Sequence, residues 1–429
     1  MSNEVSAQAV NRSGLLRSED WWAVWLGLFI VVLGAGQIWH IDLLGWAAKF
    51  GVWIDPSKAV GPGSKGFAWL GSIGSLVATY VFTLVVTSIG AYFMGTKVKK
   101  FVAGYTVIYW ITMAATVIGN YAYLAATPNK REAFNIGWSL SIGELGFVIA
   151  LLAGLVIGNF FPKVTRFLSD AAKPEWYIKT GIVILGMNIG IQAISALGLA
   201  GTVIVRGMCA VVEAYLIYWP IVYFVARKFF KFTPEWAAPM ASGISICGVA
   251  AAIATGSAIK AHQIIPTILA SVIIVFVAVE LLILPFAAAY FLPSEPMVAG
   301  SWLGLVVKSD GGAVASGAGK VSKREIWERF PKFIIGFVLV LVVIFAAGWL
   351  QPGIVDAAKA GAGQANLLRA VFFGLCFFSI GLVTNVRKLW KSGLGRVIGV
   401  YAVALVGFII WVGLFISYIF YHGIVPPTL

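Results

Sequence analysis

Apolar runs of about 20 residues, separated by short polar segments, recur along the whole of this 429-residue chain. A run of that length is what an α-helix needs to cross the hydrocarbon core of a bilayer. The composition agrees, because 60% of the residues are hydrophobic and only 11% are charged, against roughly 25% charged in soluble proteins. The sequence therefore predicts an all-α polytopic membrane protein with about 11 or 12 transmembrane segments. The ordinary expected spans are 21–38, 68–94, 101–126, 138–160, 179–196, 199–226, 263–291, 333–350, 366–386 and 397–422.

The stretch 234–260 is apolar enough to enter a bilayer, but its middle is interrupted. The interruption consists of small, polar or flexible residues: Ser242, Gly243, Ser245, Cys247 and Gly248. Irregular backbone is tolerated at membrane depth only where it lines a protected cavity, because unpaired backbone groups are costly in hydrocarbon. We therefore interpret these residues as part of a substrate site, with the N–H groups of the following half-helix directed at it. The alternative is a seam of small residues that lets helices pack closely.

A second atypical segment, 300–320, has the same character. Its interruption consists of five residues: Lys308, Ser309, Asp310, Gly311 and Gly312. Charged residues inside a membrane are expensive and are functional by default, so we expect Asp310 to take a proton or Na⁺ and Lys308 to attract an anion. The alternative is that Lys308 and Asp310 only neutralise each other.

The distribution of basic residues predicts the orientation. When the ordinary spans alternate from a cytoplasmic N-terminus, most of the 31 Lys and Arg residues fall on the cytoplasmic side, as the positive-inside rule requires. The basic segments 226–231 and 320–332 must then both be cytoplasmic. An even number of crossings has to separate them, so one interrupted segment spans the membrane and the other is re-entrant. We favour 234–260 as the re-entrant one.

A weak internal repeat predicts the domain organisation. The segment 186–199 (GMNIGIQAISALGL) resembles 381–394 (GLVTNVRKLWKSGL), and the two run in opposite directions in the orientation above. Inverted repeats are typical of secondary transporters, although chance glycine spacing is an alternative. We expect an N-terminal extension at 1–137 with three transmembrane helices, followed by a transporter core of two inverted halves at 138–429.

Other polar residues lie within the apolar runs. Glu213 and Glu280 are candidates to carry a coupling ion, or else they are buried structural groups. Asn188 and Gln192 are four residues apart on one helix face and are candidates to line the cavity. Trp219 lies near the end of its run, where tryptophans usually anchor a helix at the membrane interface.

At its two interrupted segments the sequence resembles the YeiH-like family, which is named for sulfate export. The resemblance rests on the SICG run after a basic loop, on 143–159 (GELGFVIALLAGLVIGN), on 181–186 (GIVILG) and on the segment 301–320 with Asp310. It covers residues from about 138 to 422. It implies a secondary transporter of the bacterial inner membrane with inverted repeats.

These observations favour a secondary active transporter for a small inorganic or organic anion, a sulfate-like oxyanion or a sulfonate, coupled to H⁺ or Na⁺. The alternative is a cation/proton antiporter that uses Asp310, Glu213 and Glu280. A channel is a third possibility, which saturable counterflow would exclude.

We expect no enzymatic activity, because the sequence places no Ser, His and Asp residues or metal ligands close together. We likewise expect no cofactor, no metal site and no nucleic-acid partner. The expected partners are the anion and the lipid bilayer, and the sequence leaves a homodimer open.

Overall fold

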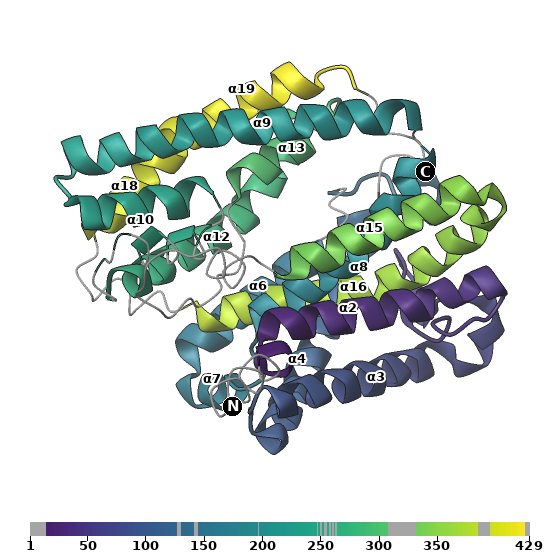
Figure 1. Cartoon of the computed structure of the whole chain (residues 1–429). Helices are drawn as coiled ribbons and strands as arrows, with labels where there is room; N and C mark the ends of the chain where they lie inside the picture. Colours follow the sequence, from purple (N-terminus) through teal and green to yellow (C-terminus); the bar gives the residue numbers. More distant parts are fainter. Residues whose placement is uncertain are drawn as a thin grey trace, which may run out of the picture. The chain divides into compact units, whose positions relative to one another are not determined.

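The computed structural model divides the chain into two compact units, which we call unit 1 and unit 2 (Figure 1). Unit 1 comprises Met1–Ser195 and Pro331–Val383, and unit 2 comprises Ala196–Phe330 and Thr384–Leu429. The two units are defined by how compactly the chain packs. The expected boundary at residue 137 separates an N-terminal extension from a core of two inverted halves, and that organisation stays a prediction. The structure describes residues 14–126, 130–140, 145–195, 197–246, 248, 251–252, 255–256, 259, 261, 264–307, 332–384 and 395–424.

Unit 1 is built from long helices with one small sheet. Its helices are α2 (Glu19–Ala35), α3 (Gly71–Phe93), α4 (Val98–Gly119), α5 (Ala122–Ala125), α6 (Leu145–Phe160), α7 (Pro162–Leu168), α8 (Pro174–Ser195), α15 (Lys332–Leu350) and α16 (Val355–Val383). Short 3₁₀ helices are η1 (Gly36–Trp39), η2 (Pro56–Lys58), η3 (Lys65–Leu70), η5 (Glu132–Phe134) and η7 (Pro352–Ile354), and the strands are β1 (Ala48–Phe50) and β2 (Val60–Pro62).

Unit 2 is built from helices, and two of its elements, η6 and η8, are π-helical turns. In chain order its elements are α9 (Leu197–Phe224), η6 (Val225–Phe229, π), α10 (Pro234–Ser245), α12 (Ile264–Phe291), α13 (Pro296–Val306), α18 (Gly395–Ala404), η8 (Leu405–Ile409, π) and α19 (Ile410–Tyr421).

The prediction of an all-α polytopic membrane protein is confirmed. In the described part of the chain, eight helices are long and apolar enough to cross a membrane, and the number is nine if the bent pair α6 and α7 forms one span. The 28-residue helix α12 corresponds to the expected span 263–291. Each of the other expected spans also falls on a helix. The three long helices expected before residue 137 are α2, α3 and α4.

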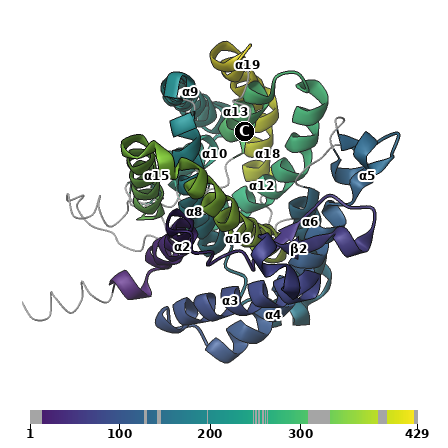
Figure 2. The same cartoon turned by 90° about the vertical axis from the view of Figure 1, so that its right-hand side faces the viewer.

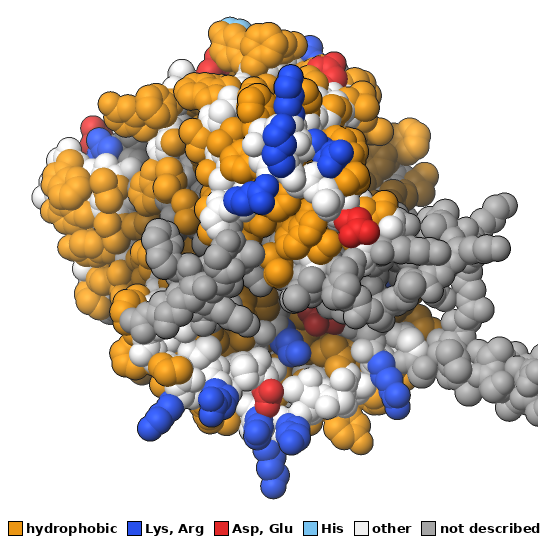
Figure 3. Space-filling model, turned by 90° about the vertical axis from the view of Figure 1, so that its left-hand side faces the viewer, with side chains coloured by type: hydrophobic (Ala, Val, Ile, Leu, Met, Phe, Trp, Pro, Cys, Tyr) orange, Lys and Arg blue, Asp and Glu red, His pale blue; other side chains and the backbone are white. Residues whose placement is uncertain are grey.

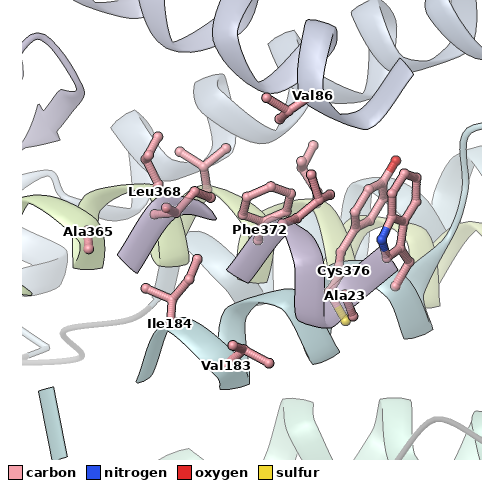
Figure 4. Packing of buried hydrophobic residues seen from close by; sticks show 14 of the residues in the cluster. Ala23, Val86, Val183, Ile184, Ala365, Leu368, Phe372 and Cys376 are labelled. Carbon is pink, nitrogen blue, oxygen red and sulfur yellow. The ribbon is translucent and has the colours of Figure 1, made fainter. Parts of the chain in front are cut away.

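Helix α16 lies at the centre of unit 1, with α2, α4, α6 and α8 packed around it (Figure 2). Close to its middle, Leu368 and Phe372 belong to one buried cluster with Ile184 of α8, and Ala23 of α2 lies beside Cys376 further along the helix (Figure 4). Helices α8 and α16 both carry apolar residues on every side, as expected for helices in a membrane rather than on a protein surface.

Glycines allow the helices of unit 1 to approach very closely. A Cβ atom added to Gly154 of α6 would lie 2.1 Å from the carbonyl oxygen of Phe378, and one added to Gly381 of α16 would lie 2.1 Å from that of Leu151. Gly361 of α16 is equally close to the carbonyl oxygen of Gly34 in α2. Since apolar burial drives little association between helices in lipid, such contacts between backbones supply much of the packing energy.

A row of hydroxyl groups follows α3 at intervals of four residues. Thr79, Thr83 and Thr87 are fully buried, and each donates a hydrogen bond to the carbonyl four residues earlier, at 2.7, 2.7 and 2.6 Å. The hydroxyl of Tyr109 in α4 donates to the carbonyl of Leu76 at 2.9 Å. These polar side chains are thus satisfied inside the helix pair without water.

The loop between α2 and α3 contains an antiparallel hairpin, which the sequence did not predict. Strand β1 pairs with β2 in the register Ala48 with Pro62 and Phe50 with Val60. The backbone N–H of Ala48 also donates to Thr79 Oγ1 at 2.8 Å, which ties the hairpin to α3. At the hairpin's tip the Ser57 N–H donates to the Asp55 carboxylate and lowers the pKa of that carboxyl.

Basic residues gather at one end of unit 1, where the turn between α3 and α4 lies close to α7 (Figure 3). Lys97, Lys99 and Lys100 are exposed in this turn, and Lys163 and Arg166 are exposed on α7. At the same end the buried Lys179 ammonium of α8 lies 2.7 Å from the Asp20 carboxylate of α2. This end has the excess of Lys and Arg that is typical of a cytoplasmic side.

Candidate functional site

A break is present between Ser242 and Gly248, but it begins only after Ser245, because Ser242, Gly243 and Ser245 belong to the last turn of α10. Helix α10 begins with Pro234 at its first position and ends at Ser245, and Ile246 has φ −106° and ψ −90°. Gly248 has φ +72°, a conformation that glycine adopts at little cost. Helical structure resumes at residues 251–252 and 255–256.

The backbone groups at this break pair within the break itself. The Gly248 N–H donates to the Gly243 carbonyl at 3.0 Å, and the Ile246 N–H donates to the Ser242 carbonyl at 3.0 Å. The Ala252 N–H donates to the Gly248 carbonyl at 3.2 Å. This resembles the ordinary termination of a helix at glycine.

The two serine side chains at the break are buried, whereas Ile246, which follows them, is exposed. Ser242 is 3% exposed, and its Oγ accepts a hydrogen bond from the indole N–H of Trp219 at 3.0 Å. Trp219 was expected to be an interfacial anchor, which stays a prediction, and its N–H is directed at Ser242. Ser245 is 0% exposed, and its Oγ has no hydrogen-bond partner among the described residues.

Close packing accounts for one residue of the predicted site. A Cβ atom at Gly243 would lie 2.7 Å from Ile273 of α12 and 3.1 Å from Ala252 on the far side of the break. The packing alternative therefore applies to Gly243, while the two serines remain candidates for binding. Cys247 lies outside the described residues.

The chain can be followed only to the residue before the second predicted interruption. Helix α13 ends at Val306, and Val307 has an extended ψ of 117°. Lys308, Ser309, Asp310, Gly311 and Gly312 lie outside the described residues, as do residues 385–394 of the second copy of the repeat. Their part in the site stays a prediction.

Of the three candidate coupling residues, the structure describes Glu280 and Glu213, which lie in different environments. Glu280 of α12 is 2% exposed and accepts a hydrogen bond from the Tyr401 hydroxyl at 3.1 Å. The Tyr401 ring stacks on Phe276 with centroids 4.0 Å apart. Glu213 of α9 is exposed. Of the pair, Glu280 is the one that the structure surrounds with protein.

In unit 1 the structure joins Asn188 to residues that sequence reasoning missed. The Asn188 amide donates to Asn366 Oδ1 at 3.0 Å, and the Nε of Arg369 donates to the same oxygen. The Arg369 guanidinium lies 4.8 Å from the centroid of the Phe373 ring. Gln192 is exposed and takes no part in this cluster. We call Asn188, Asn366 and Arg369 the α8–α16 polar cluster.

Among the described residues, no group of three or more His, Cys, Asp or Glu side chains is placed to hold a metal ion. The polar side-chain groups at the break of unit 2 are two serine hydroxyls and an indole N–H, and a carboxyl, Glu280, is buried elsewhere in the same unit. Groups of this kind can bind a small solute and exchange a proton. A guanidinium in unit 1 adds a fixed positive charge.

The comparisons with known proteins agree on a family of membrane proteins. Residues 139–326 match the family model described as Conserved hypothetical protein 698. A UPF0324 membrane protein of Nitrosomonas europaea is 35% identical over 481 aligned residues, covering 97% of this chain and 98% of the relative. A UPF0324 membrane protein of Rhodopirellula baltica is 28% identical, covering 80% of this chain and 65% of the relative.

The UPF0324 inner membrane protein YeiH of Escherichia coli is 22% identical, covering 58% of this chain and 70% of the relative. No solved structure matches the chain.

Proposed function

The chain belongs to the family of UPF0324 membrane proteins, and from that premise we propose that it is a secondary transporter that moves a small anion across the inner membrane. The proposal rests above all on one observation, the helix break at Ser245–Gly248, which begins directly after the fully buried Ser245. In lipid-embedded proteins, broken helices of this kind are retained where they line a cavity, and half-helix N-termini there favour negative charge.

A buried hydroxyl without a partner is not by itself a site. Ser379 in the continuous helix α16 is also fully buried, and its Oγ has no hydrogen-bond partner among the described residues. The difference is that Ser245 is the last residue of α10, so the backbone beside it is irregular. A comparison of variants at Ser245 and Ser379 therefore distinguishes a binding role at the break from the effect of burial alone.

Glu280 is the coupling residue in this proposal, because a carboxyl that is enclosed by protein and bonded to a Tyr hydroxyl can exchange a proton inside the membrane. Asp310 is the second candidate, retained from the sequence. The proposed orientation has the N-terminus in the cytoplasm, supported by the basic end of unit 1.

The test is uptake of labelled anions, sulfate and small sulfonates, into proteoliposomes. We expect Ser245→Ala and Asp310→Asn to lower uptake about tenfold or more, consistent with the loss of one or two hydrogen bonds to a charged ligand. Ser379→Ala is the control and should transport as the unaltered chain does. Unchanged uptake in both Ser245→Ala and Asp310→Asn would remove the proposed site.

A second pair of variants tests the coupling. Glu280→Gln should abolish uptake driven by a pH gradient and leave counterflow exchange of the anion intact, whereas Glu213→Gln should change neither. The buried Glu280 is also consistent with a second function, that of a cation/proton antiporter. Proton flux that depends on the cation present and not on any anion would favour that alternative.

A further inference from the structure

In unit 1 the helices α2 and α3 lie side by side (Figure 1) and leave an open groove of about 850 Å³ between them. Leu26 of α2 and Val86 of α3 form its floor and are buried. Phe29 of α2 and Val85 of α3 stand on its two rims and are 46% and 50% exposed. A volume of this size lies in the range of ligand pockets in proteins.

The described residues that line this groove offer an occupant no free hydrogen-bonding side chain. All of them are apolar except for the indole N–H groups of three tryptophans. Those of Trp22, Trp46 and Trp25 already donate to backbone carbonyls at 2.8, 2.7 and 3.4 Å. A polar solute would therefore lose hydrogen bonds on entering the groove, whereas a hydrocarbon chain has none to lose.

The length of the groove corresponds to one leaflet of a bilayer. On α3 it extends from Ala78 to Ile89, which at 1.5 Å per residue is about 16 Å. Half of the hydrocarbon core, which is about 30 Å thick, has nearly the same depth. Ile89 lies one turn before the end of α3 at Phe93. In a membrane the groove thus extends from close to one surface towards the middle, as an acyl chain does.

A second groove, of about 550 Å³, lies between α3 and α4. Val85 and Ile89 line both grooves and so form a ridge between them. Apart from the hydroxyls of Ser88 and Tyr92, the side chains that line the second groove are also apolar. Two apolar grooves on either side of one ridge match the shape of a lipid with two acyl chains.

Basic residues surround the end of the second groove. It reaches Val98, the first residue of α4, and the exposed lysines Lys97, Lys99 and Lys100 are its neighbours in the sequence. In the described part of the chain no carboxylate pairs with any of these lysines. Lysines at a membrane surface attract the phosphate of an anionic lipid. Acyl chains alone would gain little, because the surrounding lipid is equally apolar, so the headgroup decides which lipid is held.

We propose that the two grooves and these three lysines bind one anionic phospholipid of the surrounding bilayer. One acyl chain lies on each side of the ridge of Val85 and Ile89, and the phosphate lies at the lysines. This site does not depend on the proposed transport function. The competing occupant is a second copy of the chain. Two copies in the same membrane orientation would bring their basic ends to the same level, where like charges repel, whereas a phosphate neutralises them.

The experiment is native mass spectrometry of the full chain in detergent, with phosphatidylglycerol and phosphatidylcholine that carry the same acyl chains added separately. We expect one phosphatidylglycerol per chain, bound at least about tenfold more tightly than phosphatidylcholine. The combined variant Lys97→Gln, Lys99→Gln and Lys100→Gln should lose this preference.

The control for charge is the combined variant Lys49→Gln, Lys58→Gln and Lys65→Gln. It removes the same number of exposed lysines from the segment that precedes α3, and it should keep the preference for phosphatidylglycerol. Both combined variants alter only exposed side chains, so both should fold.

A second variant tests the grooves themselves. Val85→Trp adds bulk to the ridge that both grooves share and should weaken phosphatidylglycerol about tenfold. Its control is Val77→Trp, two turns earlier on α3, where the side chain is 42% exposed and lines neither groove.

The proposal is overturned if the unaltered chain binds both lipids equally, which would indicate ordinary surrounding lipid. It is also overturned if the variant of the lysines at 97, 99 and 100 keeps the preference, or if Val85→Trp binds phosphatidylglycerol as Val77→Trp does. A dimer that holds no lipid and that Val85→Trp dissociates would assign the ridge to a second copy instead.

Discussion

Unit 1 and unit 2 are both helical, but they differ in how regular their helices are. In unit 1 the long helices meet through glycines such as Gly154 and Gly381, at distances that leave no room for a side chain. In the described part of unit 2, by contrast, three helices carry a proline in their interior and two continue into π-helical turns. One helix of unit 2 also stops at Ser245 in buried surroundings.

The irregular backbone of unit 2 is supported by specific side chains. At the π turn of η8, the Tyr218 hydroxyl donates to the Ile409 carbonyl at 3.3 Å, and the Trp302 indole donates to the Ile410 carbonyl at 2.8 Å. Such turns are frequent at functional sites because they release backbone groups from the regular ladder. The comparison teaches that the helices of unit 1 meet through tight backbone contacts, whereas unit 2 interrupts its helices beside buried polar side chains.

The largest effect is expected where a glycine contact in unit 1 is filled. Gly381→Leu would bring its Cβ within 2.1 Å of the Leu151 carbonyl oxygen and 2.7 Å of the Leu155 nitrogen, both rigid backbone atoms. We expect a loss of about 3 kcal/mol in the free energy of unfolding, or failure to fold. The control on the same helix is Gly363→Leu, where a Cβ meets nothing within 4 Å. Equal unfolding temperatures in detergent for the two variants would contradict the role given to glycine contacts.

A smaller effect on stability, with a large one on transport, is expected at the break of unit 2. Gly248→Ala places a side chain at φ +72° and should cost roughly 1–2 kcal/mol. Gly95→Ala in the turn between α3 and α4, at φ +78°, should cost about the same. Uptake into proteoliposomes should fall only for Gly248→Ala. If both variants transport normally, the break is a structural turn of the same kind as the one at Gly95.

The smallest effect on the free energy of unfolding is expected when either of two buried tyrosine hydroxyls is removed. Tyr218→Phe removes the donor to a carbonyl at the π turn of unit 2, and Tyr109→Phe removes a donor to Leu76 in the continuous helix α3. We expect Tyr218→Phe to lower the free energy of unfolding by about 0.6 kcal/mol. Tyr109→Phe should lower it less, because the Leu76 carbonyl keeps its helical partner. Thermal unfolding measures both, and a larger loss for Tyr109→Phe would break the comparison.

The long helices were predictable because each buries an apolar run of membrane length. The end of α10 was predicted to within a few residues, but Gly243 and Ser245, which were expected to interrupt the helix, form its packed last turn. Arg369 was missed for a local reason. Its expected span began at residue 366, but the Gly- and Ala-rich segment before it is helical, so α16 begins at Val355 and the arginine is central.

Contacts between distant parts of the chain could not be read from the sequence. Asp42 accepts from Gln364, 322 positions later, and Asn188 donates to Asn366, 178 positions later. No local pattern encodes such pairs. The hairpin of β1 and β2 was missed because its strands have only three residues each and contain Gly61 and Pro62, which are poor strand formers.

The composition of unit 1 from two separate stretches of chain has a consequence for its biosynthesis. Helices α2 and α8, which carry Ala23 and Ile184, leave the ribosome long before α16, the helix that helps to bury these residues. Residues 196–330 are made in between, which takes on the order of 10 s. During that interval lipid, or a chaperone of the insertion machinery, must cover the apolar surfaces of α2 and α8. A chain truncated before residue 331 would lack α16, so these surfaces would stay uncovered by protein.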